Sequence, residues 1–237
     1  MRKLCLFLLT GSCWRTLVSL LVFGSMLGEA GAEMATNQVV QTGPETFRIG
    51  AIDLNRKERT LRFPAEVRIT NEVVEYALVT RDGKTHESVL TTEVSPTHLH
   101  VAVLLLGITP APDLGLTNAP IRLQKNSTAR IDVTWKPVGK KKEQRARLGD
   151  LISLQPSIGN SVPARRRFGV DRWSYTGSFL HEGLFLAQEE GSIVSLIRDP
   201  VALLNNPAID RDNDDIHFAN PHRLPPKGTP VTLEIRF

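Results

Sequence analysis

Alternation between apolar and polar residues is the main pattern along the chain after residue 46. It predicts short β-strands, because successive side chains of a strand point to opposite faces. The segments with this pattern are 47–54, 60–63, 67–69, 74–80, 85–91, 130–135, 173–179, 184–188, 192–197 and 231–237. Residues 140–148 can return as an exposed partner of 130–135. Residues 153–168, which precede the later strands, are a long irregular stretch that contains three arginines at 165–167.

An Asp-Gly dipeptide at 82–83 separates two of these segments, 74–80 and 85–91. Asp-Gly between alternating segments is the strongest short-range signal for a two-residue hairpin turn. We therefore expect an antiparallel hairpin here.

The expected hairpin places His86 and Glu87 among apolar side chains. Directly opposed residues share a face, so His86 would lie opposite Val79 and Glu87 opposite Leu78. A buried charge is costly unless it is paired. We expect one of the two to be at least half buried, with a polar partner. The pair could serve as a general base or metal ligand, but a structural anchor is the preferred interpretation.

One apolar segment predicts a helix at about 96–106. The serine and proline at 95–96 suit the N-cap and the first helical position, and Gly107 suits the C-terminal cap. Residues 101–106 are apolar on all sides, so we expect this helix to be buried all round. A buried strand is the alternative, since so short an apolar run has no diagnostic period. A second, short helix is expected at about 200–204.

This order of elements indicates an α+β fold with a mainly antiparallel β-sheet, many short strands, one buried helix and one short helix. Strands and helices do not alternate as they would in a parallel α/β fold. We expect residues 47–237 to form a single β-rich domain, because the length is sufficient for one substantial core.

The first 32 residues have the pattern of a signal peptide. A basic start precedes an apolar stretch at 16–27, which is too short to span a bilayer alone, and Ala30-x-Ala32 is a small-residue cleavage pattern. We expect cleavage after Ala32 and a flexible leader at 33–46. The protein would then be exported to the periplasm or cell envelope. The alternative is an uncleaved N-terminal membrane anchor.

Cysteine and charge limit the chemistry of the mature chain. Both cysteines, Cys5 and Cys13, lie in the expected signal peptide. A cysteine-free chain cannot hold an iron–sulfur cluster or a zinc-thiolate site, nor use a cysteine nucleophile. Removing the signal peptide takes away three basic residues and one acidic residue and lowers the formal charge from +4 to +2. A nearly neutral body does not indicate a nucleic-acid binder.

Strong catalytic motifs are absent from the sequence, including Gly-rich phosphate loops, G-x-S-x-G and H-E-x-x-H. We assign no catalytic residue, and the lack of a strong motif favours a protein that is not an enzyme without deciding the question. The candidate polar cluster consists of His86, Glu87, Ser88, His100, His181 and Glu182. His86, Glu87 and His100 are the candidates for a metal site. The neighbouring His98 cannot join His100 on one metal if both lie on a helix, because residues two apart point to different sides.

A basic run could contact an anionic partner. It contains Lys136, Lys140, Lys141, Lys142, Arg145 and Arg147. A solvated hairpin face is the default interpretation of such a run. Contact with anionic lipid or an envelope polymer is the alternative, since both occur outside the cytoplasm.

Five segments of the chain resemble the YdjY-like family of bacterial proteins. They are LRFPAEV, EYALVTRDGKTHESVL, SPTHLHVAVLLLG, WSYTGS and FLAQEEGSIVSLIRDPVALLN. The resemblance implies an exported or envelope protein whose biochemistry is not established. Some members carry a ferredoxin-type label, which the cysteine content of the expected mature chain does not support.

Two functional hypotheses follow. The preferred one is an exported or envelope-associated binding or scaffold module, whose ligand the sequence does not specify. The alternative is a metal-binding protein or metal-assisted enzyme that uses a cluster of His86, Glu87 and His100.

Overall fold

The computed structural model describes residues 39–112, 120–155 and 164–237. The expected signal peptide, its cleavage site and both cysteines lie outside the described residues. The strands are β1 (Val39–Gly43), β2 (Thr46–Ile49), β3 (Ile52–Asn55), β4 (Thr60–Val67), β5 (Tyr76–Thr80), β6 (Ser88–Thr92), β7 (Thr128–Trp135), β8 (Gln144–Arg147), β9 (Ile152–Leu154), β10 (Arg166–Arg167), β11 (Trp173–Tyr175), β12 (Leu180–His181), β13 (Leu184–Phe185), β14 (Ser192–Ser195), β15 (Leu204–Asn205), β16 (His217–Ala219) and β17 (Pro230–Arg236). The helices are α1 (Pro96–Leu105) and α2 (Leu186–Glu190), with 3-10 turns η1 (Thr85–Glu87), η2 (Leu148–Leu151) and η3 (Ile209–Asp212).

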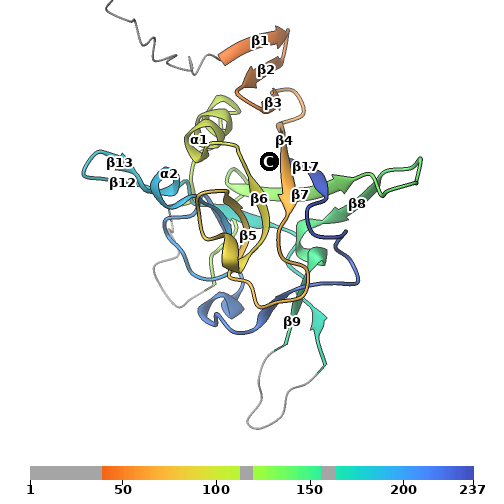
Figure 1. The fold of residues 1–237 in the computed structure, drawn as a ribbon. Helices are drawn as coiled ribbons and strands as arrows, with labels where there is room; N and C mark the ends of the chain where they lie inside the picture. The colour runs from red at the N-terminus through yellow and green to blue at the C-terminus, as the bar shows by residue number, and fades with distance from the viewer. Residues whose placement is uncertain (1–38, 113–119, 156–163) are drawn as a thin grey trace, which may run out of the picture. The chain divides into compact units, whose positions relative to one another are not determined.

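Eight of these strands close into a barrel (Figure 1). The order is β4-β17-β7-β11-β15-β14-β5-β6, and β6 pairs back onto β4. Most neighbours are antiparallel; β14 with β15 and β5 with β6 are parallel. Closure leaves no unpaired edge among these strands. The expected α+β fold with a mainly antiparallel sheet and many short strands is confirmed.

Four of the remaining strands extend the sheet of the barrel, and the other five form two small sheets. β1, β2 and β3 continue the sheet beyond β4 as an antiparallel meander, and β8 pairs with β7. β1 begins at Val39, so part of the segment expected to be a flexible leader is a strand paired with β2. β10, β9 and β16 form a separate three-stranded sheet, and β12 pairs with β13.

The predicted hairpin at residues 74–91 is wrong. β5 and β6 are adjacent but parallel, with Leu78 beside Leu90, and a short crossover at 81–87 joins them. Both strands are almost fully buried on both faces, so the sequence carries no one-sided pattern that would fix their pairing. Gly83 does not form a hairpin turn. It allows the backbone of Glu190 to approach closely, since an added Cβ at residue 83 would lie 3.0 Å from the carbonyl oxygen of Glu190.

The predicted helix at 96–106 is confirmed as α1, but it is not buried all round. Ser95 caps it through its side chain, which accepts a hydrogen bond from the backbone of His98. Leu99, Ala102 and Val103 face the protein, whereas Leu104 and Leu105 are 47% and 39% exposed. The helix packs on one side, against β3 and α2.

The short helix expected at 200–204 is a turn that leads into β15, and the second helix is α2. The side chain of Asp199 explains the turn, because it accepts a hydrogen bond from the backbone N–H of Val201 at 2.8 Å. This contact two residues along the chain competes with helical hydrogen bonding. No helix within the described ranges is long and apolar enough to cross a bilayer.

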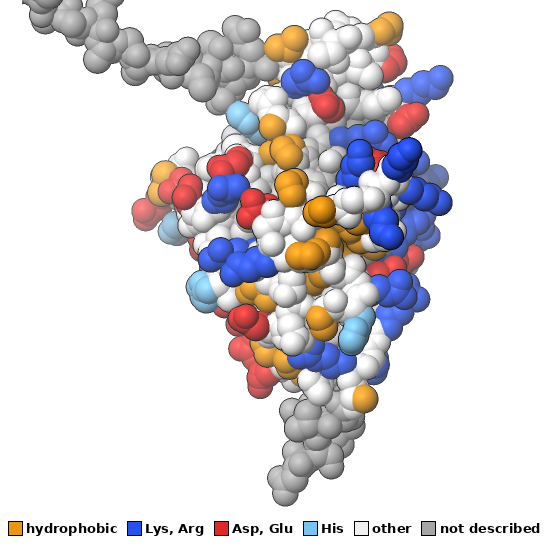
Figure 2. Space-filling view, turned by 45° about the vertical axis from the view of Figure 1, so that its right-hand side comes forward, with side chains coloured by type: hydrophobic (Ala, Val, Ile, Leu, Met, Phe, Trp, Pro, Cys, Tyr) orange, Lys and Arg blue, Asp and Glu red, His pale blue; other side chains and the backbone are white. Residues whose placement is uncertain are grey.

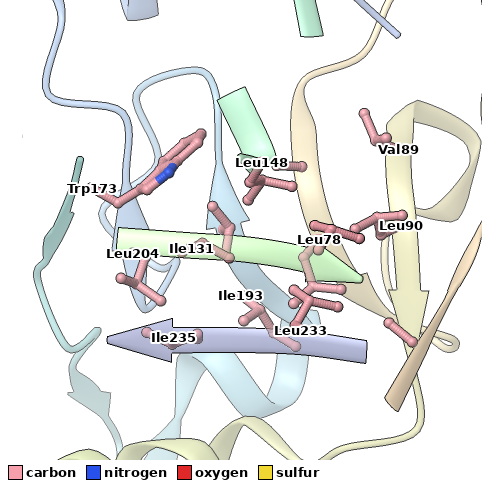
Figure 3. Close-up of a cluster of buried hydrophobic side chains, with 14 of the residues drawn as sticks. Leu78, Val89, Leu90, Ile131, Leu148, Trp173, Ile193, Leu204, Leu233 and Ile235 are labelled. Atoms are coloured by element: carbon pink, nitrogen blue, oxygen red, sulfur yellow. The ribbon is translucent and has the colours of Figure 1, made fainter. Parts of the chain in front are cut away.

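The core fills the barrel with side chains from strands that are distant in sequence (Figure 3). The labelled members, all buried, are Leu78, Val89, Leu90, Ile131, Leu148, Trp173, Ile193, Leu204, Leu233 and Ile235. This packing holds the strands rigid, so that the loops and short sheets around the barrel present their side chains at fixed positions.

Candidate functional site

The pair His86 and Glu87 lies in η1, at the end of the crossover between β5 and β6. The His86 side chain is 80% exposed, and its Nε2 lies 3.6 Å from Oε2 of Glu87, whose side chain is 23% exposed. Glu87 is thus the more buried of the two, although the hairpin from which its burial was inferred does not exist.

Ser88 and His100 are each committed to a structural contact. Ser88 is fully buried and donates a hydrogen bond from Oγ to the carbonyl oxygen of Leu90 at 2.8 Å. Nδ1 of His100 lies 2.7 Å from the hydroxyl of Tyr175, and its ring packs beside Phe185. Burial lowers the pKa of His100, which favours the neutral form of this half-buried ring.

His181 and Glu182 lie at the exposed turn between β12 and β13. Glu182 has a positive φ of 51°, which the tight turn imposes. The six candidate residues therefore do not form one cluster. Among the residues that the structure describes, no group of three or more histidine, cysteine, aspartate or glutamate side chains is placed to hold a metal ion.

A polar cluster that the sequence did not reveal surrounds Lys84. Its Nζ lies 2.8 Å from Oε2 of Glu190 and 3.0 Å from the hydroxyl of Tyr76, which donates a hydrogen bond to Asp199 at 3.0 Å. Burial alone would lower the pKa of Lys84, but the hydrogen bonds to Glu190 and Tyr76 raise it above its usual value. The lysine stays charged and fixes the crossover to the barrel, which is a structural role.

The basic run is divided into two parts with different roles. Arg145 and Arg147 point from β8 to Asp132 on β7, at 2.6 and 2.9 Å, and Arg145 also reaches Glu234 at 2.9 Å. The four lysines lie on the exposed tip of the β7–β8 hairpin. Of the basic run, only the lysines at this tip remain available for an anionic partner.

A basic cavity of about 700 Å³ lies beside the small sheet of β10, β9 and β16. We call it the arginine pocket. Its lining residues are Asn71, Asp150, Ser153, Arg165, Arg166, Arg167, Asn220, Pro221, His222 and Arg223. Four arginines thus face one carboxylate across a concave surface, which concentrates positive potential there.

Arg165 is oriented in the arginine pocket by neutral groups. Its guanidinium donates to the side chain of Asn71 at 2.7 Å and to Gln155 at 3.3 Å, and it stacks over the ring of Phe218 at 4.1 Å. These contacts hold the planar group in place without cancelling its charge. A fixed guanidinium that keeps its charge is suited to bidentate binding of a carboxylate or phosphate.

The one carboxylate that lines the arginine pocket, that of Asp150, is bound by an arginine of the same pocket. Asp150 accepts hydrogen bonds from Arg167, with Nε at 2.9 Å. Arg223 makes no ion pair with any residue in the described ranges, and Arg166 makes none within 4.0 Å, although its charge helps to lower the pKa of Asp210. The connection between β9 and β10, residues 156–163, contains no aspartate or glutamate in its sequence. Among the described residues that line it, the arginine pocket therefore has four arginines and one aspartate.

The sequence signal for this site was the arginine triplet at 165–167. It lay in a stretch expected to be irregular, whereas two of the three arginines form β10. β10 pairs with β9, with Arg166 opposite Leu154 and Arg167 opposite Ser153. Asn71 and Arg223 join the pocket from distant parts of the chain, which the sequence alone does not show.

A family model described as the YdjY domain matches residues 52–236. The matched range runs from β3 to β17 and contains the barrel, both helices and the arginine pocket. None of the curated proteins matches the chain, and neither does any solved structure. The family match covers most of the chain and agrees with the segments that resemble this family, so the chain belongs to the YdjY domain family.

Proposed function

We propose that this protein is an exported, envelope-associated binding module that holds an anionic ligand in the arginine pocket. The observation that carries this proposal is the position of Arg165, which neutral partners and an aromatic ring hold in place without a carboxylate. Its three neighbouring arginines line the same pocket, where the one aspartate is paired with Arg167. A ligand with carboxylate or phosphate groups would supply the missing counter-charge.

The chemistry of the lining residues supports binding. Guanidinium groups remain protonated at physiological pH, so arginines orient and hold anions but do not exchange protons with a substrate. The neutral side chains of Asn71, Ser153 and Asn220 add hydrogen-bonding groups to the cavity. The ligand class proposed is therefore a polyanion of small size with polar substituents.

Export and envelope association rest on the N-terminal sequence. The basic start, the short apolar stretch and the small residues at Ala30 and Ala32 support cleavage by a signal peptidase. N-terminal sequencing of the protein recovered from the envelope fraction should find Glu33 first. An intact Met1 on protein found only in the cytoplasm would contradict export.

Isothermal titration with citrate and with inorganic phosphate tests the arginine pocket. Arg165→Gln should weaken binding of the better probe by about tenfold or more, because a hydrogen bond to a charged group contributes about 1.5–3 kcal/mol. Arg165→Lys keeps the charge but loses the two-pronged geometry, so it should restore only part of the affinity.

The matched control is Arg56→Gln, which removes an exposed arginine from the turn between β3 and β4. It changes the net charge equally and should leave binding intact. If neither probe binds the parent protein, or if Arg165→Gln binds as the parent does, the arginine pocket is not an anion site.

A further inference from the structure

The tip of the β7–β8 hairpin carries an unmatched positive charge. Lys136, Lys140, Lys141 and Lys142 are all exposed, and Glu143 is the one acidic residue beside them. None of the four lysines forms an ion pair with a residue in the described part of the chain. Figure 1 shows the hairpin reaching outward from the barrel, and Figure 2 shows Lys and Arg side chains gathered on that side of the molecule.

An apolar residue stands at the end of this hairpin. The side chain of Val138 is 102% exposed, and Gly139 follows it with a φ of 72°, which lets the chain turn sharply. A single exposed valine is ordinary on a protein surface. Here it lies at the tip of the hairpin between Lys136 and Lys140, so a surface that contacts these lysines also meets an apolar side chain.

The base of the hairpin is held firmly by the ion pairs of Arg145 and Arg147 with Asp132 and Glu234. These guanidiniums are engaged within the protein and are not available to a partner. They fix β8 against β7, so that the tip is presented as one unit and only its side chains need to be ordered on contact.

We propose that the tip of the β7–β8 hairpin docks onto an anionic phospholipid bilayer. The lysines contact the headgroup phosphates, and Val138 reaches the boundary of the acyl chains. A bilayer suits this tip better than a soluble polyanion, because only a bilayer offers an apolar layer directly beneath its negative charges. The docking surface is separate from the arginine pocket and does not depend on the ligand proposed for it.

Sedimentation with vesicles tests the docking, using protein purified from an exporting host. Vesicles of phosphatidylglycerol and phosphatidylethanolamine should bind the parent protein, and vesicles of phosphatidylcholine should not. Each lysine near an anionic surface is worth about a fivefold change in partitioning. The variant Lys140→Gln, Lys141→Gln, Lys142→Gln should therefore bind about 100-fold more weakly.

The matched control replaces three exposed lysines elsewhere, Lys57, Lys125 and Lys227, with glutamine. It removes the same net charge and should bind like the parent. Equal losses in the two triple variants would mean that overall charge, not the hairpin, determines binding. Parent protein that does not sediment with the anionic vesicles would also overturn the proposal.

Val138→Ser separates a bilayer from a soluble polyanion, because it removes the apolar side chain without changing the charge. It should weaken vesicle binding but leave binding of soluble polyglutamate unchanged, while the protein remains folded, as judged by its circular dichroism spectrum. If Val138→Ser binds vesicles as the parent does, the hairpin recognises negative charge alone and the bilayer assignment is wrong. Arg165→Gln should leave vesicle binding unchanged, so failure of the arginine pocket and failure of the docking surface can be told apart.

Discussion

Two groups of arginines in this protein differ in what neutralises them. On the outer face of β4, β17, β7 and β8, Glu234 is shared by Arg62, Arg145 and Arg236, and Asp132 is shared by Arg145 and Arg147. Both carboxylates are buried, and the guanidiniums cover them. We call this group the matched cluster.

The arginine pocket has the opposite balance. Its single carboxylate is bound to Arg167, and the best-fixed guanidinium, that of Arg165, has only neutral partners. The comparison teaches that the number of arginines in a region says little about its role. The carboxylates around them decide whether the charges stabilise the fold or remain available to a ligand.

Removing a carboxylate from the matched cluster should have the largest effect. Glu234→Ala leaves three guanidiniums without their shared partner, and the Glu234 side chain is only 6% exposed. We expect the free energy of unfolding to fall by about 2–3 kcal/mol, less than for a fully buried pair because the guanidiniums are partly exposed. Urea denaturation measures it. The control Glu143→Ala, at an exposed position nearby, should stay within about 0.5 kcal/mol of the parent.

The same carboxylate should make stability depend on pH. Burial alone would raise the pKa of Glu234, but hydrogen bonds from Arg62 and Arg236 lower it below its usual value. A lowered folded-state pKa gives stability that is present above the unfolded pKa of about 4.3 and is lost as the pH falls through the folded pKa. Between pH ~5 and ~3, Glu234→Gln should lose less stability than the parent; parallel losses would contradict this.

Lys84 is a lysine whose charge, like those of the matched cluster, is neutralised within the protein. It is bound by Glu190 and Tyr76 and lies 4.0 Å from Asp199. Lys84→Ala should lower the free energy of unfolding by about 1–2 kcal/mol, since it leaves polar partners without their donor. Thermal melts should show a clear shift for this variant and almost none for the exposed control Lys57→Ala. Equal melting temperatures would mean that the cluster around Lys84 does not anchor the crossover.

The smallest effect, with the opposite sign, is expected in the arginine pocket. Arg223→Gln removes one unneutralised charge and relieves repulsion, so the melting temperature at low salt should rise slightly, by the equivalent of about 0.2–0.5 kcal/mol. Arg145→Gln in the matched cluster should instead lower it. A fall for both variants would show that the two groups of arginines do not differ in the way we describe.

Local sequence patterns predicted the elements that have one buried face and one exposed face. Alternation found the strand that became β7, and the capping residues around Ser95 found α1. The pairing of β5 with β6 could not be found in this way. Both strands are buried on each face, so their partners are set by the closure of the barrel and not by a local turn.

The candidate site was harder to predict for a related reason. The arginine triplet is visible in the sequence, but whether a charge is matched depends on carboxylates that arrive from other strands. Arg145 forms an ion pair with Glu234 of β17, whereas Arg165 donates a hydrogen bond to the neutral side chain of Asn71. The candidate histidines His86, His100 and His181 lie on three different elements, η1, α1 and β12.

The position of β17 has a consequence for how the chain is made. β17 lies between β4 and β7, and residues 230–236 pair with residues 60–66 along their whole length. The barrel therefore cannot close until β17 has been synthesised, and β4 remains unpaired on that side until then. Synthesis of the whole span from β4 to β17 thus comes before closure, and a protein shortened before residue 230 should fail to fold and be degraded.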